Sequence, residues 1–147
     1  MKQLSIGIIG VGWPGHQHAK AIAAIPNTRL RSCADSDPKR LDAFVKEYEP
    51  DVAFTDYRDL LHDTDLEAAI VCLPNFLHFP ASLAALEEGK HVLCEKPPTM
   101  NAAEMKVLRD EAAKRNSIYF FGRQFRFTPA IRTARAAAEA DGGRARW

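Results

Sequence analysis

The sequence has 147 residues, of which 46% are hydrophobic and 27% are charged, and its formal net charge is +1. This length suits one domain with a sizeable core, and the near-neutral charge gives no reason to expect a nucleic acid or a membrane surface as a partner. No apolar run approaches the ~20 residues that a membrane-spanning helix needs.

The chain has three cysteines, Cys33, Cys72 and Cys94, which is an odd number, and their spacing shows no pairs. We therefore expect free thiols that pack as small buried groups in a cytoplasmic protein, and the start of the chain lacks the layout of a signal peptide. Cys94 is either such a structural thiol or a nucleophile. No metal site is expected, since no Cys-x-x-Cys spacing occurs and His16 and His18 point to different sides of a predicted helix.

Residues 4–24 predict a strand, a tight glycine-rich turn and a helix. Six residues form this turn: Gly10, Val11, Gly12, Trp13, Pro14 and Gly15. Gly10 permits the sharp turn, Gly12 lets a ligand approach the backbone, and Gly15 lets the helix pack closely on the strand. The free N–H groups and the positive end of the helix dipole favour a pyrophosphate, so we predict that the turn binds a dinucleotide. The alternative is a tight turn that binds nothing.

A second predicted strand, 29–34, ends at Asp35, which lies 20 positions beyond Gly15. A carboxylate at this place can accept hydrogen bonds from both ribose hydroxyls of an adenosine and repels a 2′-phosphate, so it favours NAD over NADP. The alternative is a loop carboxylate that caps the next helix. Arg40, on that helix, keeps NADP open because it can reach a phosphate.

The rest of the chain alternates predicted strands with predicted helices. Strands are expected near 52–55, 68–73, 91–94 and 118–121, and helices near 38–48, 57–61, 79–88 and 101–115, with a last helix from Thr128-Pro129 to Gly142-Gly143. This alternation predicts an α/β fold with a doubly wound parallel (Rossmann) sheet, helices on both faces and the strand order 3-2-1-4-5-6. A ligand then lies at the carboxyl ends of the strands, between strands 1 and 4.

Two turns follow strands at that edge. The first contains Leu73, Pro74, Asn75 and His78. Asn75 can bond a ribose or a carboxamide, and the dipole of the following helix favours a neutral imidazole at His78. The alternative is an ordinary turn asparagine with a capping histidine.

The second turn carries Glu95 and Lys96, followed by two prolines that stiffen the backbone. Adjacent charges on a loop are usually only solvated. At the predicted crevice, however, a lysine can donate a hydrogen bond to a substrate hydroxyl or, once deprotonated, accept its proton as hydride leaves.

Four segments resemble the Gfo/Idh/MocA family of NAD(P)-dependent sugar and cyclitol oxidoreductases: GIIGVGWPGHQHAKAI (7–22), CADSDPKR (33–40), EEGKHVLCEKP (87–97) and GRQFRFTPAIR (122–132). The resemblance implies that Lys96 is the catalytic lysine and that Glu95 helps to place the nicotinamide. It also implies that Pro74, Asn75 and His78 line the cofactor. Arg123 is expected to contact it where the chain turns toward the substrate.

Family members are roughly twice as long, which is consistent with two domains. The resemblance implies a dinucleotide-binding domain at 1–122, with 123–147 as a connecting helix and the start of a substrate domain. That second domain supplies most of the polyol pocket and a proton-transfer histidine, and it can mediate homo-oligomers. We therefore expect the chain alone to bind NAD(H) with little or no turnover. The alternatives are a dinucleotide-sensing module without catalysis and a scaffold with no cofactor.

Overall fold

The computed structural model of the chain describes residues 3–140 and 142. Six parallel strands form one sheet in the order β3-β2-β1-β4-β5-β6, which confirms the predicted Rossmann topology. The strands are β1 (Leu4–Ile9), β2 (Thr28–Ala34), β3 (Val52–Phe54), β4 (Ala68–Val71), β5 (His91–Cys94) and β6 (Tyr119–Phe121). The order reverses between β1 and β4, where a crevice opens beyond the ends of the strands.

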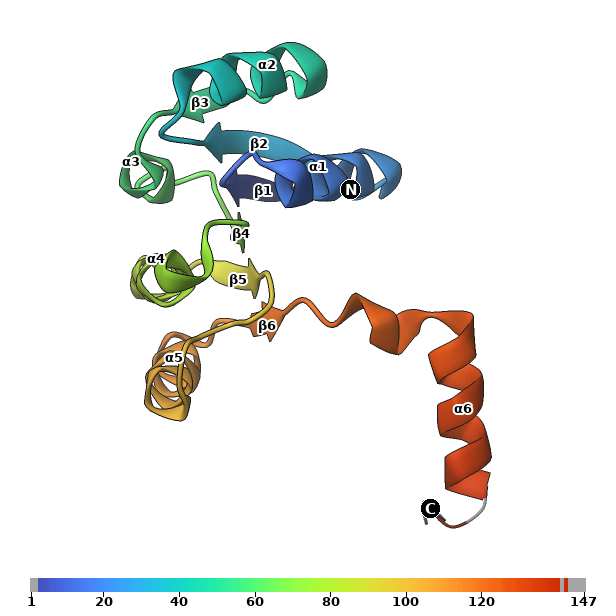
Figure 1. Cartoon of the computed structure of the whole chain (residues 1–147). Helices are drawn as coiled ribbons and strands as arrows, with labels where there is room; N and C mark the ends of the chain where they lie inside the picture. Colours follow the sequence, from blue (N-terminus) through green and yellow to red (C-terminus); the bar gives the residue numbers. More distant parts are fainter. Residues whose placement is uncertain (1–2, 141, 143–147) are drawn as a thin grey trace.

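Helices cover both faces of the sheet (Figure 1). On one face lie α1 (Trp13–Ala24) and α2 (Pro38–Tyr48), and on the other lie α3 (Tyr57–Leu61), α4 (Asn75–Glu87) and α5 (Ala102–Arg115). Each face has its own apolar core, one around Ile8 and Phe44 and the other around Ile9 and Leu86. Neighbouring residues of β1 thus serve opposite cores, as expected of a strand that is buried on both faces.

Two boundaries at the crevice differ from the prediction. The strand β4 ends at Val71 rather than at Leu73, and α4 begins at Asn75 rather than at Phe79. A proline is favourable at the start of a helix, so either Pro74 or Pro80 could mark the start of α4. In the structure, Pro74 is the N-cap residue. Pro80 then lies inside the helix on its exposed side, where water can satisfy the carbonyl left without an N–H partner.

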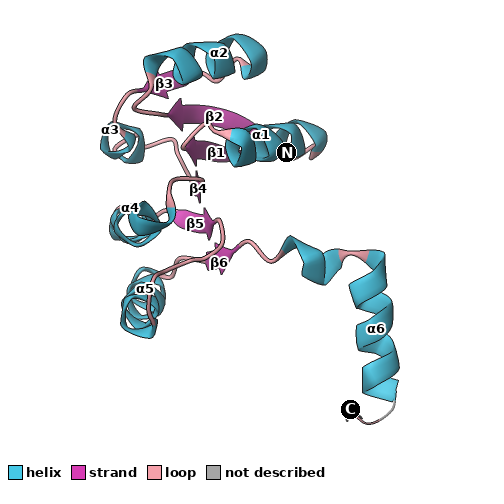
Figure 2. Ribbon diagram, in the orientation of Figure 1, coloured by secondary structure: helices cyan, strands magenta, loops and turns pink. Residues whose placement is uncertain are grey.

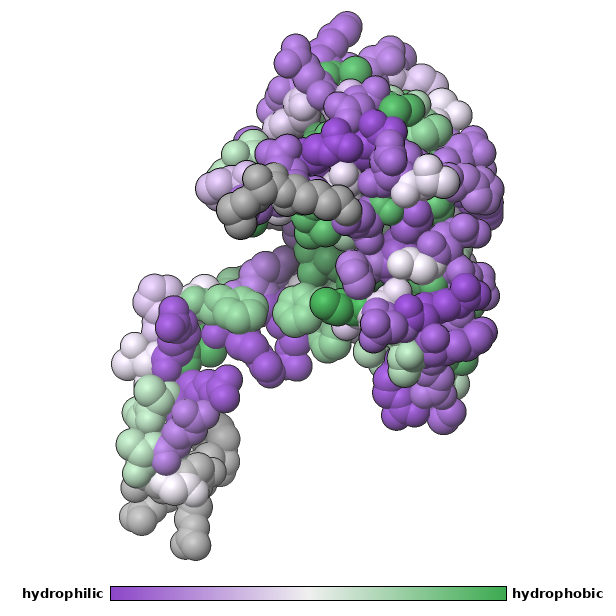
Figure 3. All heavy atoms as spheres, turned by 180° about the vertical axis from the view of Figure 1, so that it is seen from behind, coloured by the Kyte–Doolittle hydropathy of each residue, from purple (hydrophilic) through white to green (hydrophobic). Residues whose placement is uncertain are grey.

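After β6 the chain leaves the sheet. A 3-10 turn, η1 (Gln124–Phe127), and α6 (Pro129–Ala140) form what we call the arm, which stands apart from the helices of the sheet (Figure 2). Neither element of the arm has a buried residue, and Phe125 and Phe127 are exposed. Figure 3 shows hydrophobic residues gathered where the arm leaves the body. Of the predicted ending, Gly143 and residues 144–147 lie outside the described residues.

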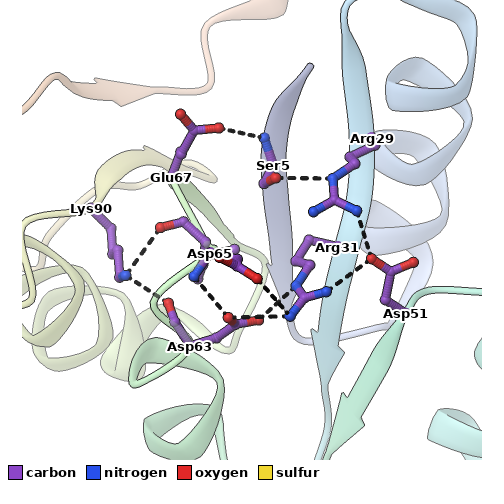
Figure 4. A network of polar contacts seen from close by, with 9 residues as sticks. Ser5, Arg29, Arg31, Asp51, Asp63, Asp65, Glu67 and Lys90 are labelled. Atoms are coloured by element: carbon purple, nitrogen blue, oxygen red, sulfur yellow. Dashed lines mark hydrogen bonds and ion pairs between the residues drawn. The ribbon is translucent and has the colours of Figure 1, made fainter. Parts of the chain in front are cut away.

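The opposite edge of the sheet, where the strands begin, is tied together by ion pairs (Figure 4). Arg31 on β2 bonds the carboxylates of Asp51 and Asp63, while the Lys90 amine donates to the carbonyls of Asp63 and Leu66. These contacts fix the loops on that side. Within residues 3–140 and 142, no helix is long and apolar enough to cross a membrane.

Candidate functional site

The glycine-rich turn makes two close backbone contacts that leave no room for a side chain, one with the residue after β4 and one with the start of α1. Gly10 has φ +90°, and a Cβ atom there would lie 2.7 Å from the carbonyl oxygen of Cys72. A Cβ atom on Gly15 would lie 2.5 Å from the carbonyl oxygen of Gly10. At Gly12 the nearest atom to such a Cβ is Pro14 Cδ at 3.9 Å. Gly10 and Gly15 therefore serve packing, while Gly12 faces open space.

The start of α1 is suited to an anion. Its N-cap residue, Gly12, makes no side-chain cap, its first turn has no acidic residue, and Pro14 lies in that turn. The helix therefore keeps backbone N–H groups and its positive dipole end for a ligand. Val11 is buried, and its N–H is not free for a ligand because it donates to Asp35 Oδ2 over 3.0 Å.

Asp35 lies directly after β2 with 8% of its surface exposed. Its Oδ1 accepts from Arg40 Nη2 (2.9 Å) and from the N–H of Asp37 (2.9 Å). Burial alone would raise the pKa of this carboxyl, but hydrogen bonds from Arg40, Asp37 and Val11 outweigh it and hold the pKa below its usual value. The group is therefore a carboxylate at neutral pH, and Oδ2 still has room to accept from a ligand hydroxyl.

Two cavities flank the glycine-rich turn and share Leu73. The larger has a volume of about 650 Å³, which is in the usual range for ligand sites. It is lined by Trp13, Pro14, Gln17, His18, Ala21, Cys72, Leu73, Asn75, His78, Glu95, Lys96, Gln124 and Phe125. The smaller, of about 270 Å³, lies on the side of β2 and is lined by Asp35, Ser36, Tyr57 and Arg58 among others. A two-part ligand can thus lie across the turn with one end in each cavity.

Glu95 is held in the larger cavity by side chains from two other elements. Its Oε1 lies 2.9 Å from His18 Nε2 on α1 and accepts from Gln124 Nε2 on the arm over 3.0 Å. The carboxylate is mostly buried, with 12% of the side chain exposed. Through these two contacts, the Glu95 side chain connects the end of β5 with α1 and with the arm.

Lys96 follows Glu95 and is exposed. It lines both the larger cavity of the pair just described and a third, adjoining cavity toward the arm, whose volume of about 680 Å³ is similar. The peptide bond from Lys96 to Pro97 is cis. Arg123 lies in the adjoining cavity and not in the larger one, with its guanidinium 5.9 Å from the centre of the Phe121 ring. A cofactor contact at Arg123 therefore stays a prediction.

His78 is buried beneath these residues, with 1% of its surface exposed. Its Nδ1 lies 2.6 Å from the carbonyl oxygen of Pro97, and its Nε2 lies 2.7 Å from that of Leu73. Carbonyl oxygens only accept, and a neutral ring has a single N–H. The ring therefore lies between two backbone carbonyl oxygens, and the neutral imidazole expected from the helix dipole donates to one of them.

The cysteines act as core residues. All three are free and buried, and burial raises the pKa of Cys94 to about 11, so this group stays a thiol at neutral pH. This favours a structural thiol over a nucleophile. Among residues 3–140 and 142, no cluster of three or more histidine, cysteine or acidic side chains could hold a metal ion.

The structure brings together seven of the predicted site residues in the larger cavity: Trp13, Pro14, Leu73, Asn75, His78, Glu95 and Lys96. Gly10, Val11 and Pro74 do not line this cavity. Arg40 donates to Asp35, which lines the smaller cavity. Sequence reasoning missed Gln17, His18 and Ala21, although their spacing from Trp13 and Pro14 places all five on one side of α1. It also missed Gln124, because the path of the arm has no local signal.

We expect His18 and Glu95 to be energetically coupled. In a double-mutant cycle of His18→Phe and Glu95→Ala, the coupling free energy of unfolding should be about 1–2 kcal/mol, because one hydrogen bond to a largely buried carboxylate is lost only once. Urea unfolding measures it. His16→Phe is the matched control, since His16 bonds Tyr48 instead. Additivity of His18→Phe with Glu95→Ala would contradict the pairing.

Comparison with known proteins identifies the family. The profile of the oxidoreductase family Gfo/Idh/MocA, NAD-binding Rossmann fold, matches residues 4–123. Myo-inositol 2-dehydrogenase of Thermotoga maritima is 29% identical over 136 residues, which cover 92% of this chain and 41% of that protein.

Solved structures agree with this match. The structure of scyllo-inositol dehydrogenase from Lactobacillus casei with bound NAD(H) and scyllo-inositol has a TM-score of 0.88 and 29% identity, over 95% of this chain and 42% of that one. For levoglucosan dehydrogenase in complex with NADH, the TM-score is 0.87 and the identity 28%, over 95% of this chain and 40% of that one. The chain thus spans about two fifths of the length of these relatives.

Proposed function

Because the chain belongs to the Gfo/Idh/MocA oxidoreductase family, whose NAD-binding domain it represents, we propose that it presents the nicotinamide of NAD to Lys96. The complete reaction would transfer hydride between the cofactor and a secondary alcohol of a sugar, cyclitol or related polyol. The observation that carries this proposal is the place of Lys96. Its side chain lines the larger cavity, whose other walls are the start of α1 and the turn after β4.

The residues of the chain fit a dinucleotide laid across the strand switch. The uncapped start of α1 would bind the pyrophosphate, Asp35 the adenosine ribose, and the larger cavity the nicotinamide end. When bound, the cofactor supplies the hydride acceptor. The Lys96 amine would hydrogen-bond the substrate hydroxyl and accept its proton as the carbon loses hydride. Glu95, anchored by His18 and Gln124, would orient Lys96 or the nicotinamide ribose.

The remaining parts of the proposal concern the protein around this domain. We propose that residues 1–122 form the cofactor domain and that 123–147 lead to a substrate domain, which would complete the polyol pocket and can mediate homo-oligomers. The exposed aromatic residues of the arm support such a connection. A cytoplasmic location fits the three free, buried cysteines, which suit a reducing compartment.

Titration of the purified chain with NADH, followed by fluorescence, tests the proposal directly. We expect saturable binding, and a polyol panel then distinguishes a catalytic chain from a sensing module that binds without turnover. No binding of NADH or NADPH would leave only the scaffold alternative and overturn the proposal.

Asp35 is expected to set the preference for NADH over NADPH. Asp35→Ser should lower the ratio of the NADPH Kd to the NADH Kd by about tenfold or more, because it removes a charged acceptor for the ribose and a charge that repels the 2′-phosphate. It also frees Arg40 to reach that phosphate. Parallel titrations with both cofactors give the ratio.

Asp37→Ser is the matched control for this change. Asp37 is a nearby carboxylate, but it caps α2 by accepting from the N–H groups of Lys39 and Arg40, and serine keeps that function. The control should leave the ratio unchanged. If Asp35→Ser also leaves it unchanged, the role assigned to Asp35 is wrong.

A further inference from the structure

His78 connects the two turns that border the larger cavity. It lies in the first turn of α4 and reaches back to the carbonyl of Leu73 and across to the carbonyl of Pro97. Leu73 lines both cavities, and Pro97 directly follows Lys96. A single rigid ring therefore spans the gap between the turn after β4 and the turn after β5.

This arrangement leaves His78 no polar atom for a ligand. Both ring nitrogens are within 2.7 Å of backbone oxygens, and the residue is 1% exposed although its ring forms part of the cavity wall. Its influence on a bound cofactor or substrate has to pass through the backbone that it holds.

We propose that His78 is a positioning residue, which fixes the turn carrying Lys96 because its ring is held between the carbonyls of Pro97 and Leu73. The inference rests on the proposed role of Lys96 and adds a residue that acts through it. It replaces the direct cofactor contact expected for His78.

The neighbours of Lys96 explain why this bond matters. On the preceding side, Glu95 is anchored through its side chain by His18 and Gln124. On the following side, the ring of His78 on α4 lies 2.6 Å from the carbonyl oxygen of Pro97, which gives this turn a polar contact with α4. Lys96 is itself exposed, as are Pro97 and Met100 nearby. Without the imidazole, the Pro97 carbonyl can turn toward water, and the lysine moves with it.

The test uses the side-chain signal of Lys96 in the 147-residue chain. Reductive ¹³C-dimethylation gives each lysine an NMR signal, and loss of one signal in Lys96→Gln assigns it. We expect His78→Leu to shift and broaden the Lys96 signal without any cofactor. His78→Gln keeps an N–H donor and should retain part of the native signal.

His91→Leu is the matched control. His91 also bonds the backbone, since its Nδ1 accepts from the N–H of Ile118, but it lies at the other edge of the sheet. This variant should leave the Lys96 signal unchanged. A native Lys96 signal in folded His78→Leu, or in His78→Ala if the leucine variant does not fold, overturns the proposal. The cofactor-free spectra test positioning alone, so a failure to bind NADH would count against the proposed function and not against this inference.

Discussion

Gly15→Ala and Gly12→Ala are expected to separate the two tasks of the glycine-rich turn. Gly15→Ala should lower the free energy of unfolding by about 1–3 kcal/mol, because its Cβ would lie 2.5 Å from the Gly10 carbonyl oxygen and must push α1 off the turn. NADH binding should be lost as well, since the uncapped start of α1 moves with the helix. Urea unfolding and NADH fluorescence give the two quantities.

Gly12→Ala provides the contrast, because an added Cβ meets no atom closer than 3.9 Å and the backbone, at φ −71°, suits any residue. The variant should fold with native stability. A methyl group on the side open to the pyrophosphate should nevertheless weaken NADH binding by about tenfold or more. Native NADH affinity in Gly12→Ala would show that the ligand does not approach this part of the backbone.

Lys96→Gln is expected to have the largest effect on catalysis. Any polyol-dependent formation of NADH that the chain supports should fall by about 10²–10⁴, because glutamine cannot take the hydroxyl proton. The NADH Kd should change little, since the pyrophosphate and adenosine ends are bound by other residues. Steady-state absorbance of NADH and direct titration measure the two effects.

Lys90→Gln is a poor control for this variant, because the Lys90 amine is buried on two carbonyl oxygens. Lys106→Gln serves better, since Lys106 is exposed on α5 and its ion pair among the described residues is with Asp110. It should leave both the rate and the NADH Kd unchanged. If the unmodified chain turns over a polyol, an equal rate for Lys96→Gln would remove Lys96 from the mechanism.

Much of the fold can be predicted from the sequence, because its signals are local. The glycine-rich turn, the buried run that forms β4 and the alternation of helices with strands specify a parallel sheet, and the handedness of crossovers then specifies the strand order. Asp35 was found by the same logic, from its place at the end of β2. The start of α4 was wrong because two prolines, Pro74 and Pro80, carry the same local signal.

Side-chain contacts between distant elements could not be predicted in this way. His18 and Glu95 are 77 positions apart, and nothing in either neighbourhood signals the other. The two carbonyls beside His78 are likewise backbone groups, which carry no sequence identity. The cofactor contacts of the predicted residues remain predictions, and their tests are the titrations described above.

The central place of β1 has a consequence for synthesis on the ribosome. The residues of β1 pair with β2 on one side and with residues 68–71 on the other, and the N–H of Cys72 donates to the Ile9 carbonyl. The hydrogen bonds of β1 are therefore complete only after residues 68–71 have been made, more than 50 residues later. Nascent chains that end before these residues should lack a finished glycine-rich turn, however much of α1 and β2 has already emerged.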